Sequence, residues 1–215
     1  MPQYIAFVDA GYLIAEGARA LGLPRQDTQP NAQGCVEWLT DLAGRDSCPL
    51  LRAYWYDGAF DAGSPRYPSQ RSYFDAIAST PGIQLRLAHI SERTPAWQYS
   101  VKQALQACGV ELAEFERHFQ FRPELTQKGV DTLMVLDILR LAQRRAYDTA
   151  VIIAGDRDLA EAIRVAQDEG RRMVLAPPEG GGVATELRQL ADVIIPLERT
   201  VLQQMLRSRR PRQTA

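Results

Sequence analysis

Three aspartates follow apolar runs that have the composition of buried strands. Asp9 comes directly after YIAFV, and Asp156 and Asp158 follow AVIIAG. A short run with β-branched residues that stops at such a boundary is typical of a strand buried on both faces. Because open parallel sheets bind their ligands beyond the carboxyl ends of the strands, we expect these three carboxylates to lie close together at one edge.

A fourth aspartate, Asp131, is identified by its position on a helix predicted over Val130–Arg145. It lies in the first turn, on the same face as the apolar side chains of Met134 and Ile138. A lone buried carboxylate is costly unless a cation compensates its charge, and the amino end of a helix favours negative charge. We therefore expect Asp131 at the floor of the same site.

Two other aspartates are excluded from the predicted site. Asp137 lies on the other side of that helix, with Arg140 and Arg144, which predicts a solvated, ion-paired face. Asp57 also follows a predicted strand, Leu50–Tyr56, but the turn-like GAFDAG after it favours a structural role.

Helix capping is the structural alternative for the nominated aspartates. Asp9 has the position of an N-cap for a helix predicted over Ala10–Leu21, and Asp131 has that of a first-turn partner of the helix dipole. Asp158 with Glu161 resembles a capping box. Both roles, capping and metal binding, stay open for these residues.

The candidate ligands are all carboxylates, without His or Cys nearby. Such hard oxygen ligands favour Mg²⁺ or Mn²⁺, which retain water and bind the phosphate groups of a substrate. A metal of this kind activates water and stabilises charge on a phosphodiester. Lys128 and Arg157 each lie within three residues of a nominated aspartate and are the predicted phosphate-binding side chains. The sequence has no P-loop and no nucleophile elbow.

Strand-like and helix-like segments alternate along the chain, which predicts an α/β fold with a mostly parallel sheet covered on both faces. We expect one domain over residues 1–200, with an irregular insertion at 91–129, and a C-terminal helix end and basic tail at 201–215. Within the insertion, the sequence predicts a helix, a short strand and a loop, over Trp97–Cys108, Phe119–Arg122 and Pro123–Gly129.

The composition narrows the class of protein. The formal net charge of −1 lacks the global positive field of many nucleic-acid binders, so a nucleic-acid site must be local. No apolar run approaches the roughly 20 residues of a membrane span. The three cysteines are far apart and odd in number, which predicts a reducing, cytoplasmic location without disulfides or a structural zinc.

Two segments resemble a known family. QKGVDTLMVLDILRLA at 127–142 and YDTAVIIAGDRDLAEAIRVAQDEGRRMVLA at 147–176 are similar to NYN-domain proteins, in the LabA-like branch of the PIN-like nuclease superfamily. FVDAGYL and RAYWYDG fit the same family, and the resemblance covers roughly residues 4–196. It implies a three-layer α/β/α PIN-like fold and an acidic, metal-dependent site of the ribonuclease type. The residues that match its acidic positions are Asp9, Asp131, Asp156 and Asp158.

The sequence therefore predicts a metal-dependent nuclease that hydrolyses phosphodiester bonds, in RNA in preference to DNA. Tyr12 stands where the family often has Asn, and Arg157 replaces a small hydroxyl residue. These departures motivate the alternative of a non-catalytic nucleic-acid-binding or regulatory module. A phosphatase that forms an aspartyl-phosphate is disfavoured, because the DAG that begins at Asp9 lacks a second acid. A homo-oligomer is compatible with the sequence, and membrane association is not expected.

Overall fold

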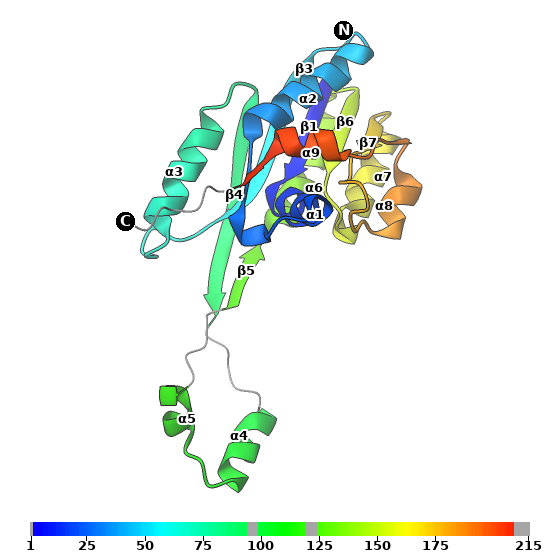
Figure 1. Cartoon of the computed structure of the whole chain (residues 1–215). Coiled ribbons are helices and arrows are strands. Elements are labelled where there is room, and N and C mark those ends of the chain that lie inside the picture. The colour runs from blue at the N-terminus through cyan, green and yellow to red at the C-terminus, as the bar shows by residue number, and fades with distance from the viewer. Residues whose placement is uncertain (1, 94–98, 119–123, 209–215) are drawn as a thin grey trace, which may run out of the picture.

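A central sheet organises the protein. The computed structural model describes residues 2–93, 99–118 and 124–208. Seven strands pair in the order β5-β4-β3-β1-β6-β7-β8, and every neighbouring pair is parallel except β4 with β5 (Figure 1). The predicted mostly parallel sheet is confirmed. The strands are β1 (Tyr4–Asp9), β3 (Leu50–Ala59), β4 (Ile83–Arg93), β5 (Glu124–Lys128), β6 (Thr149–Ile153), β7 (Arg172–Leu175) and β8 (Val193–Ile194).

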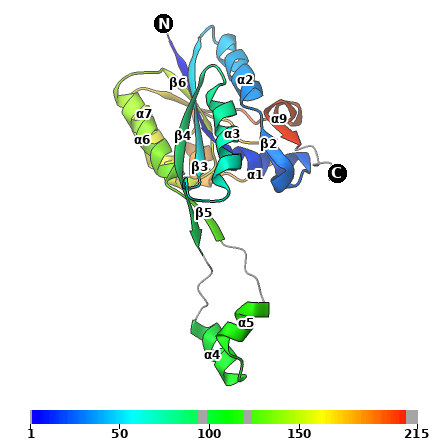
Figure 2. The ribbon, with the colours of Figure 1, turned by 90° about the vertical axis from the view of Figure 1, so that its left-hand side faces the viewer.

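Helices cover both faces of this sheet (Figure 2). Alternate residues of β1 point to opposite faces, so that Ala6 and Val8 belong to one buried apolar cluster and Ile5 and Phe7 to another. The three-layer α/β/α architecture is confirmed. The first cluster includes α1 (Ala10–Leu21), α2 (Ala32–Arg45), α3 (Tyr67–Ala78) and α9 (Arg199–Met205), and the second includes α6 (Val130–Gln143), α7 (Ala160–Asp168) and α8 (Thr185–Leu190).

The central strand and the helix after it position the first aspartate of the site. Every residue of β1 from Tyr4 to Val8 is buried, as expected for a strand covered on both faces. The strand ends at Asp9, whose carboxylate accepts a hydrogen bond from the Tyr12 amide and caps α1. The helix stops at Gly22, which has the left-handed φ of +71° that glycine tolerates. These signals explain why the helix predicted over Ala10–Leu21 is confirmed.

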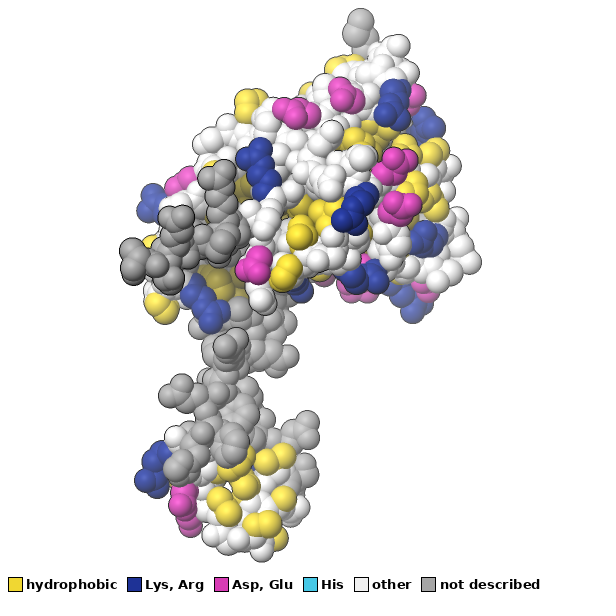
Figure 3. All heavy atoms as spheres, viewed as in Figure 1, with side chains coloured by type: hydrophobic (Ala, Val, Ile, Leu, Met, Phe, Trp, Pro, Cys, Tyr) yellow, Lys and Arg dark blue, Asp and Glu magenta, His cyan; other side chains and the backbone are white. Residues whose placement is uncertain are grey.

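The insertion leaves the sheet at its carboxyl edge. It contains α4 (Tyr99–Ala107) and α5 (Leu112–His118), which lie apart from both helical layers (Figures 1 and 2). The helix predicted over Trp97–Cys108 is confirmed for Tyr99–Ala107, and its first residue lies outside the described residues. The predicted strand Phe119–Arg122 also lies outside them. The predicted loop Pro123–Gly129 is wrong, because β5 pairs there with β4. Hydrophobic side chains gather over this pair of helices, whereas charges of both signs are interspersed on the body (Figure 3).

A second, two-stranded sheet ties the C-terminal part of the chain to the body. The strand β2 (Thr28–Pro30) pairs antiparallel with β9 (Leu206–Ser208), and Leu202, Met205 and Leu206 are buried in the cluster that includes α1 and α2. Residues 201–208 thus pack on the same core as β1, and the remaining tail lies outside the described residues. Within the described ranges, none of the helices has the length and apolar character needed to cross a membrane.

Candidate functional site

The carboxyl edge of the sheet brings together aspartates from separate segments. Asp9 ends β1, beside Tyr56 of β3, and Asp156 follows β6, the strand on the other side of β1. Asp131 lies in the first turn of α6. The negative charges of Asp156 and Asp158 raise the pKa of Asp131, and the charge of Asp131 raises the pKa of Asp9. The structure therefore places Asp131 within electrostatic reach of each of the other three nominated carboxylates.

Asp9 carries the most perturbed of these carboxyl groups. Burial raises the pKa of Asp9 to about 6, and the negative charges of Asp131 and Asp57 add to that effect. The hydrogen bond from the Tyr12 amide, 3.0 Å from Oδ1, works in the opposite direction. Asp9 thus caps α1, and its negative charge is disfavoured by burial and by the neighbouring carboxylates. Helix capping and metal binding are therefore compatible at this residue.

Asp131 is half-buried at the start of α6. Burial raises the pKa of Asp131, and the charges of Asp156 and Asp158 raise it further. The residue one turn along the helix, Met134, is fully buried against the sheet. Asp131 therefore sits at the boundary between the apolar core and the open edge, where a cation would relieve the repulsion between the carboxylates.

Asp156 and Asp158 are exposed at the turn that follows β6. The Asp158 amide donates a hydrogen bond to Asp156 Oδ1 at 2.9 Å, so Asp156 caps the short 3₁₀ helix η2 (Arg157–Leu159). The capping box predicted for Asp158 is wrong, because η2 intervenes and α7 begins only at Ala160, without a side-chain cap. This leaves the Asp158 carboxylate without a capping role.

Asp57 contributes to the same edge, although its sequence context favoured a purely structural role. Its Oδ1 accepts a hydrogen bond from the Gly58 amide at 2.7 Å, and its Oδ2 accepts one from the Tyr73 hydroxyl at 3.0 Å. Burial raises the pKa of Asp57, and its charge raises that of Asp9. The signal in the sequence was the position of Asp57 just after an apolar strand, as for Asp9.

The prediction that Asp137 is solvated is wrong. Asp137 is buried, accepts a hydrogen bond from the Tyr56 hydroxyl at 3.0 Å, and is ion-paired with Arg86 Nη2 at 2.8 Å. It lies three residues after Met134, and Asp131 lies three before, so each is about 60° from Met134 around the helix. The helix periodicity predicted the position of Asp131. It could not predict that Tyr56 of β3 and Arg86 of β4 supply buried partners for Asp137.

Of the two predicted phosphate-binding residues, only Arg157 has a side chain among the described residues. Arg157 is exposed and forms an ion pair with Glu186 of α8, with Nε 3.0 Å from Oε1. Lys128 pairs with His89 through the backbone of β5 and β4, and its side chain lies outside the described residues. An exposed ion pair contributes little stability, so the pair does not hold Arg157 strongly away from a phosphate.

A pocket of about 330 Å³ opens beside Asp9 and Asp156, on the side of α1. One wall is the glycine-rich turn Gly180–Gly182, which two residues of α1 hold in place. The Gly182 amide donates a hydrogen bond to Glu16 Oε2 at 2.7 Å, and Arg19 donates one to the Gly180 carbonyl at 3.0 Å. The residues that line the pocket are Asp9, Gly11, Tyr12, Glu16, Arg25, Gly155, Asp156 and Gly182.

Tyr12 forms part of this pocket at the position where a family member often has Asn. A Cβ atom at Gly155 would lie 2.4 Å from Tyr12 Cε2 and 2.7 Å from the Gly182 carbonyl oxygen. The glycine after β6 therefore lets the Tyr12 ring pack directly against the backbone. The Tyr12 hydroxyl is buried without a hydrogen-bond partner in the described part of the chain, so the Tyr12 side chain acts as a wall rather than as a ligand.

The donor set suits a hard divalent cation held in an open site. Among the described residues, no three His, Cys, Asp or Glu side chains are placed to enclose a metal ion together. Mg²⁺ commonly binds one or two carboxylates and completes its shell with water and substrate phosphates. Several mutually repelling carboxylates without nitrogen or sulfur ligands fit that kind of site, not a closed cage.

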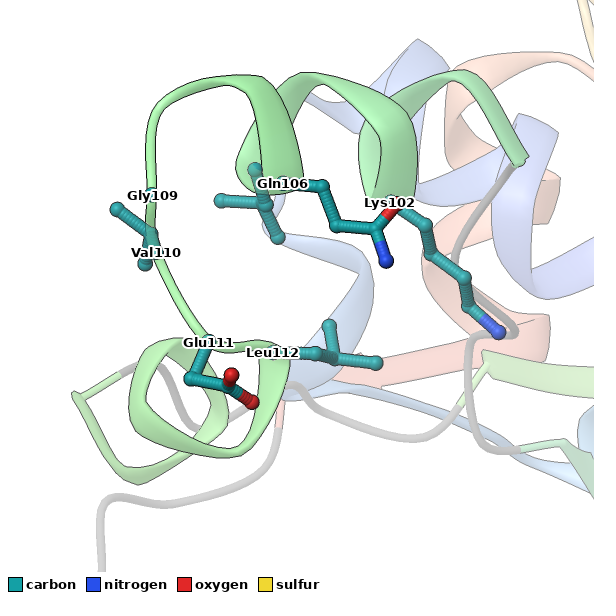
Figure 4. A pocket seen from close by; sticks show the side chains of 7 residues that line it. Lys102, Gln106, Gly109, Val110, Glu111 and Leu112 are labelled. Carbon is teal, nitrogen blue, oxygen red and sulfur yellow. The ribbon is translucent and has the colours of Figure 1, made fainter.

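A second pocket, of about 280 Å³, lies between the two helices of the insertion. Figure 4 shows Lys102 and Gln106 of α4 facing the segment that carries Glu111 and Leu112. None of the nominated aspartates lines this pocket. It therefore adds nothing to the acidic site.

Comparisons with known proteins agree with this architecture. A family model described as "NYN domain" matches residues 23–198, which include Asp131, Asp156 and Asp158. An uncharacterized protein y4oD of Sinorhizobium fredii is 35% identical over 91 residues, 41% of this chain and 42% of that protein. An uncharacterized protein MJ0482 of Methanocaldococcus jannaschii is 31% identical over 75 residues, 35% of this chain and 31% of that protein. The chain thus spans less than half the length of either relative.

Structural similarity adds support for the fold alone. The crystal structure of a protein of unknown function, VPA0982 from Vibrio parahaemolyticus, aligns with a TM-score of 0.53 over 96% of both chains. The two sequences are only 13% identical.

Proposed function

The chain belongs to the NYN domain family, and from this premise we propose that it is a metal-dependent nuclease of the LabA-like branch of the PIN-like superfamily. It hydrolyses phosphodiester bonds, in RNA in preference to DNA, with Mg²⁺ or Mn²⁺ as the cofactor. The preference for RNA rests on the resemblance of the KGVD and GDRD segments to the family.

One observation carries the proposal: carboxylates from three elements repel one another at the carboxyl edge of the sheet. Burial together with the charges of Asp131 and Asp57 raises the pKa of Asp9 to about 6. The charges of Asp156 and Asp158 likewise raise the pKa of Asp131. A fold that keeps such charges together without partners loses stability, which a bound cation restores.

In this proposal Asp9, Asp131 and Asp156 hold the metal, one or two of them by direct contact and the others through its bound water, since no three described ligands enclose an ion. Asp158 either joins them or orients a water molecule. The bound metal supplies an activated water and charge stabilisation on the phosphodiester. Asp9 must be ionised to bind, so it contributes fully above its pKa of about 6. Tyr12 excludes water from the space beside Asp9, and the exposed Arg157 exchanges Glu186 for a substrate phosphate.

A second candidate function is a non-catalytic nucleic-acid-binding or regulatory module. Two observations favour it: the aromatic ring of Tyr12 occupies the space next to Gly155, and no three potential ligands of the described residues enclose a metal. Under this alternative the acidic edge binds at most a weakly held cation and no bond is broken.

Cleavage assays separate the two candidates. The purified chain with Mn²⁺ should cut single-stranded or structured RNA, and Asp156→Asn should lose more than the about 10–100-fold that removal of an outer-shell partner costs. Asp168→Asn is the matched control, because Asp168 is exposed at the other end of α7 and should leave the rate unchanged. Intact RNA and DNA with both the wild-type chain and Asp156→Asn would contradict the proposal and favour the binding module.

The cysteines bear on the cellular setting. All three cysteines, Cys35, Cys48 and Cys108, are free thiols in the structure. Free thiols fit a reducing compartment, and we infer a cytoplasmic location. A homo-oligomer stays a prediction.

A further inference from the structure

One arginine that lines the pocket beside Asp9 has no partner among the described residues. Arg25 belongs to the 3₁₀ helix η1 (Arg25–Asp27), directly after α1, and lines the pocket together with Asp9 and Asp156. Within the described residues, the Arg25 guanidinium makes no hydrogen bond and no ion pair. A cation that faces a pocket without a partner is available to a negatively charged ligand.

The other arginines around this pocket are already engaged. Arg19 is bound to the Glu16 carboxylate and to the Gly180 carbonyl. Arg157 is paired with Glu186, and Arg188 donates to the Gly181 carbonyl at 3.3 Å. Among these four arginines, Arg25 is therefore the one whose side-chain donors have no acceptor in the part of the chain that the structure describes.

The charges on the walls show where a phosphate would lie. Glu16 is neutralised by Arg19 and by the Gly182 amide, which donates to it at 2.7 Å. The uncompensated negative charge lies at the Asp9 and Asp156 end, where a metal is proposed. Arg25 supplies the only unpaired positive charge among the residues lining the pocket. A strand whose scissile phosphate lies at the acidic end would thus place a neighbouring phosphate toward Arg25.

The size and the walls of the pocket suit one nucleotide. Its volume of about 330 Å³ falls within the range of small-molecule sites. Gly11 and Gly182 lack side chains that would narrow the pocket, and the Tyr12 ring, packed against Gly155, gives it an aromatic wall. Glycine walls allow close approach of a ligand, and aromatic rings are common surfaces for nucleotides.

We propose that this pocket binds the nucleotide next to the scissile phosphodiester of a single-stranded RNA, with Arg25 as the residue that binds its phosphate. The inference rests on the proposed function, since that function places the scissile group at the acidic edge. Arg25 acts as a positioning residue and takes no part in breaking the bond. The helix pattern and the family resemblance gave no indication of Arg25, because it lies outside every motif in the sequence.

The test measures RNA binding without turnover. The full chain in EDTA is titrated against a fluorescein-labelled 12-nucleotide single-stranded RNA at several salt concentrations. We expect Arg25→Ala to weaken binding about tenfold, and to lower the slope of log affinity against log salt by about 0.7, the value for one phosphate contact on a single strand. Arg25→Lys should retain most of that slope, because lysine binds phosphate as a point charge.

Arg45→Ala is the matched control. Arg45 is exposed at the end of α2, before β3 begins, and should leave affinity and slope unchanged. Equal affinity and salt slope for the wild-type chain and Arg25→Ala would overturn the assignment, as would an equal loss in Arg45→Ala. If the protein cleaves no RNA but Arg25→Ala still shows the specific loss, the nuclease proposal fails and the binding site stands.

Discussion

Replacing Asp9 with asparagine should abolish metal-dependent cleavage and, at the same time, stabilise the metal-free protein at pH 7 by about 3 kcal/mol. Asparagine also caps helices well, so the hydrogen bond from the Tyr12 amide is kept. What disappears is a partly buried negative charge beside Asp131 and Asp57. A substitution that removes activity and adds stability is typical of a site whose charges are held together for function.

The gain in stability should depend on pH. The pKa of Asp9 is about 6 in the folded chain and about 4 in an unfolded one. Between these values the folded state holds a proton that the unfolded state has lost, so the stability that this proton contributes is fully present below about pH 4 and is lost as the pH rises through 6. The difference between Asp9→Asn and wild type should thus be small near pH 4 and reach its full size above pH 6.

Urea unfolding of both chains in EDTA across this range measures the effect, with Asp168→Asn as the control for loss of one surface carboxylate. If Asp9→Asn is stabilised equally at every pH, or is less stable than wild type at pH 7, the negative charge of Asp9 does not destabilise the metal-free fold, which contradicts the prediction. Mn²⁺ should stabilise the wild-type chain and leave Asp9→Asn nearly unchanged, because only the former keeps the full set of proposed ligands.

The second large effect concerns the buried ion pair nearly two turns farther along α6 than Asp131. We expect Asp137→Ala to lower the free energy of unfolding by about 3 kcal/mol, because it leaves Arg86 and the Tyr56 hydroxyl without their acceptor. The Arg86 side chain is 32% exposed to solvent. Water can therefore partly solvate the unpaired guanidinium, so we expect a loss of stability at the lower end of the range for buried ion pairs. Arg86 also lies over the Tyr54 ring, 5.7 Å from its centre.

Equilibrium unfolding in urea measures this loss, and Tyr56→Phe provides the comparison. The phenylalanine variant removes one hydroxyl and leaves the Arg86–Asp137 ion pair intact, so it should cost only about 1 kcal/mol. Equal losses for Asp137→Ala and Tyr56→Phe would show that the ion pair contributes nothing beyond the hydroxyl contact.

Local signals were sufficient for most of the sheet and for the helix that follows its first strand. The apolar run before Asp9 predicted a doubly buried strand, and Asp9 and Gly22 predicted both ends of α1. Asp131 was found because it lies on the edge of an apolar helix face. In each case the residues that determine the local structure are neighbours along the chain, so the sequence pattern is enough to predict the strand or the helix.

Features that depend on distant partners were not predictable in this way. The strand β5 exists because β4 continues to Arg93, and β2 exists because β9 returns from the C-terminal end. Asp137 looked solvated because its own helix offers arginines, whereas its actual partner, Arg86, comes from a strand 51 residues earlier. Arg25 reaches the pocket only through the turn after α1.

The most direct test of the acidic site is a crystal of the full chain soaked in Mn²⁺ at pH 7.5, with data collected at a wavelength where manganese scatters anomalously. The proposal predicts an anomalous peak among Asp9, Asp131 and Asp156, in contact with a carboxylate oxygen of at least one of them and with the remaining positions filled by water. A crystal in which these carboxylates bind no manganese, although the soak is saturating, would contradict the account.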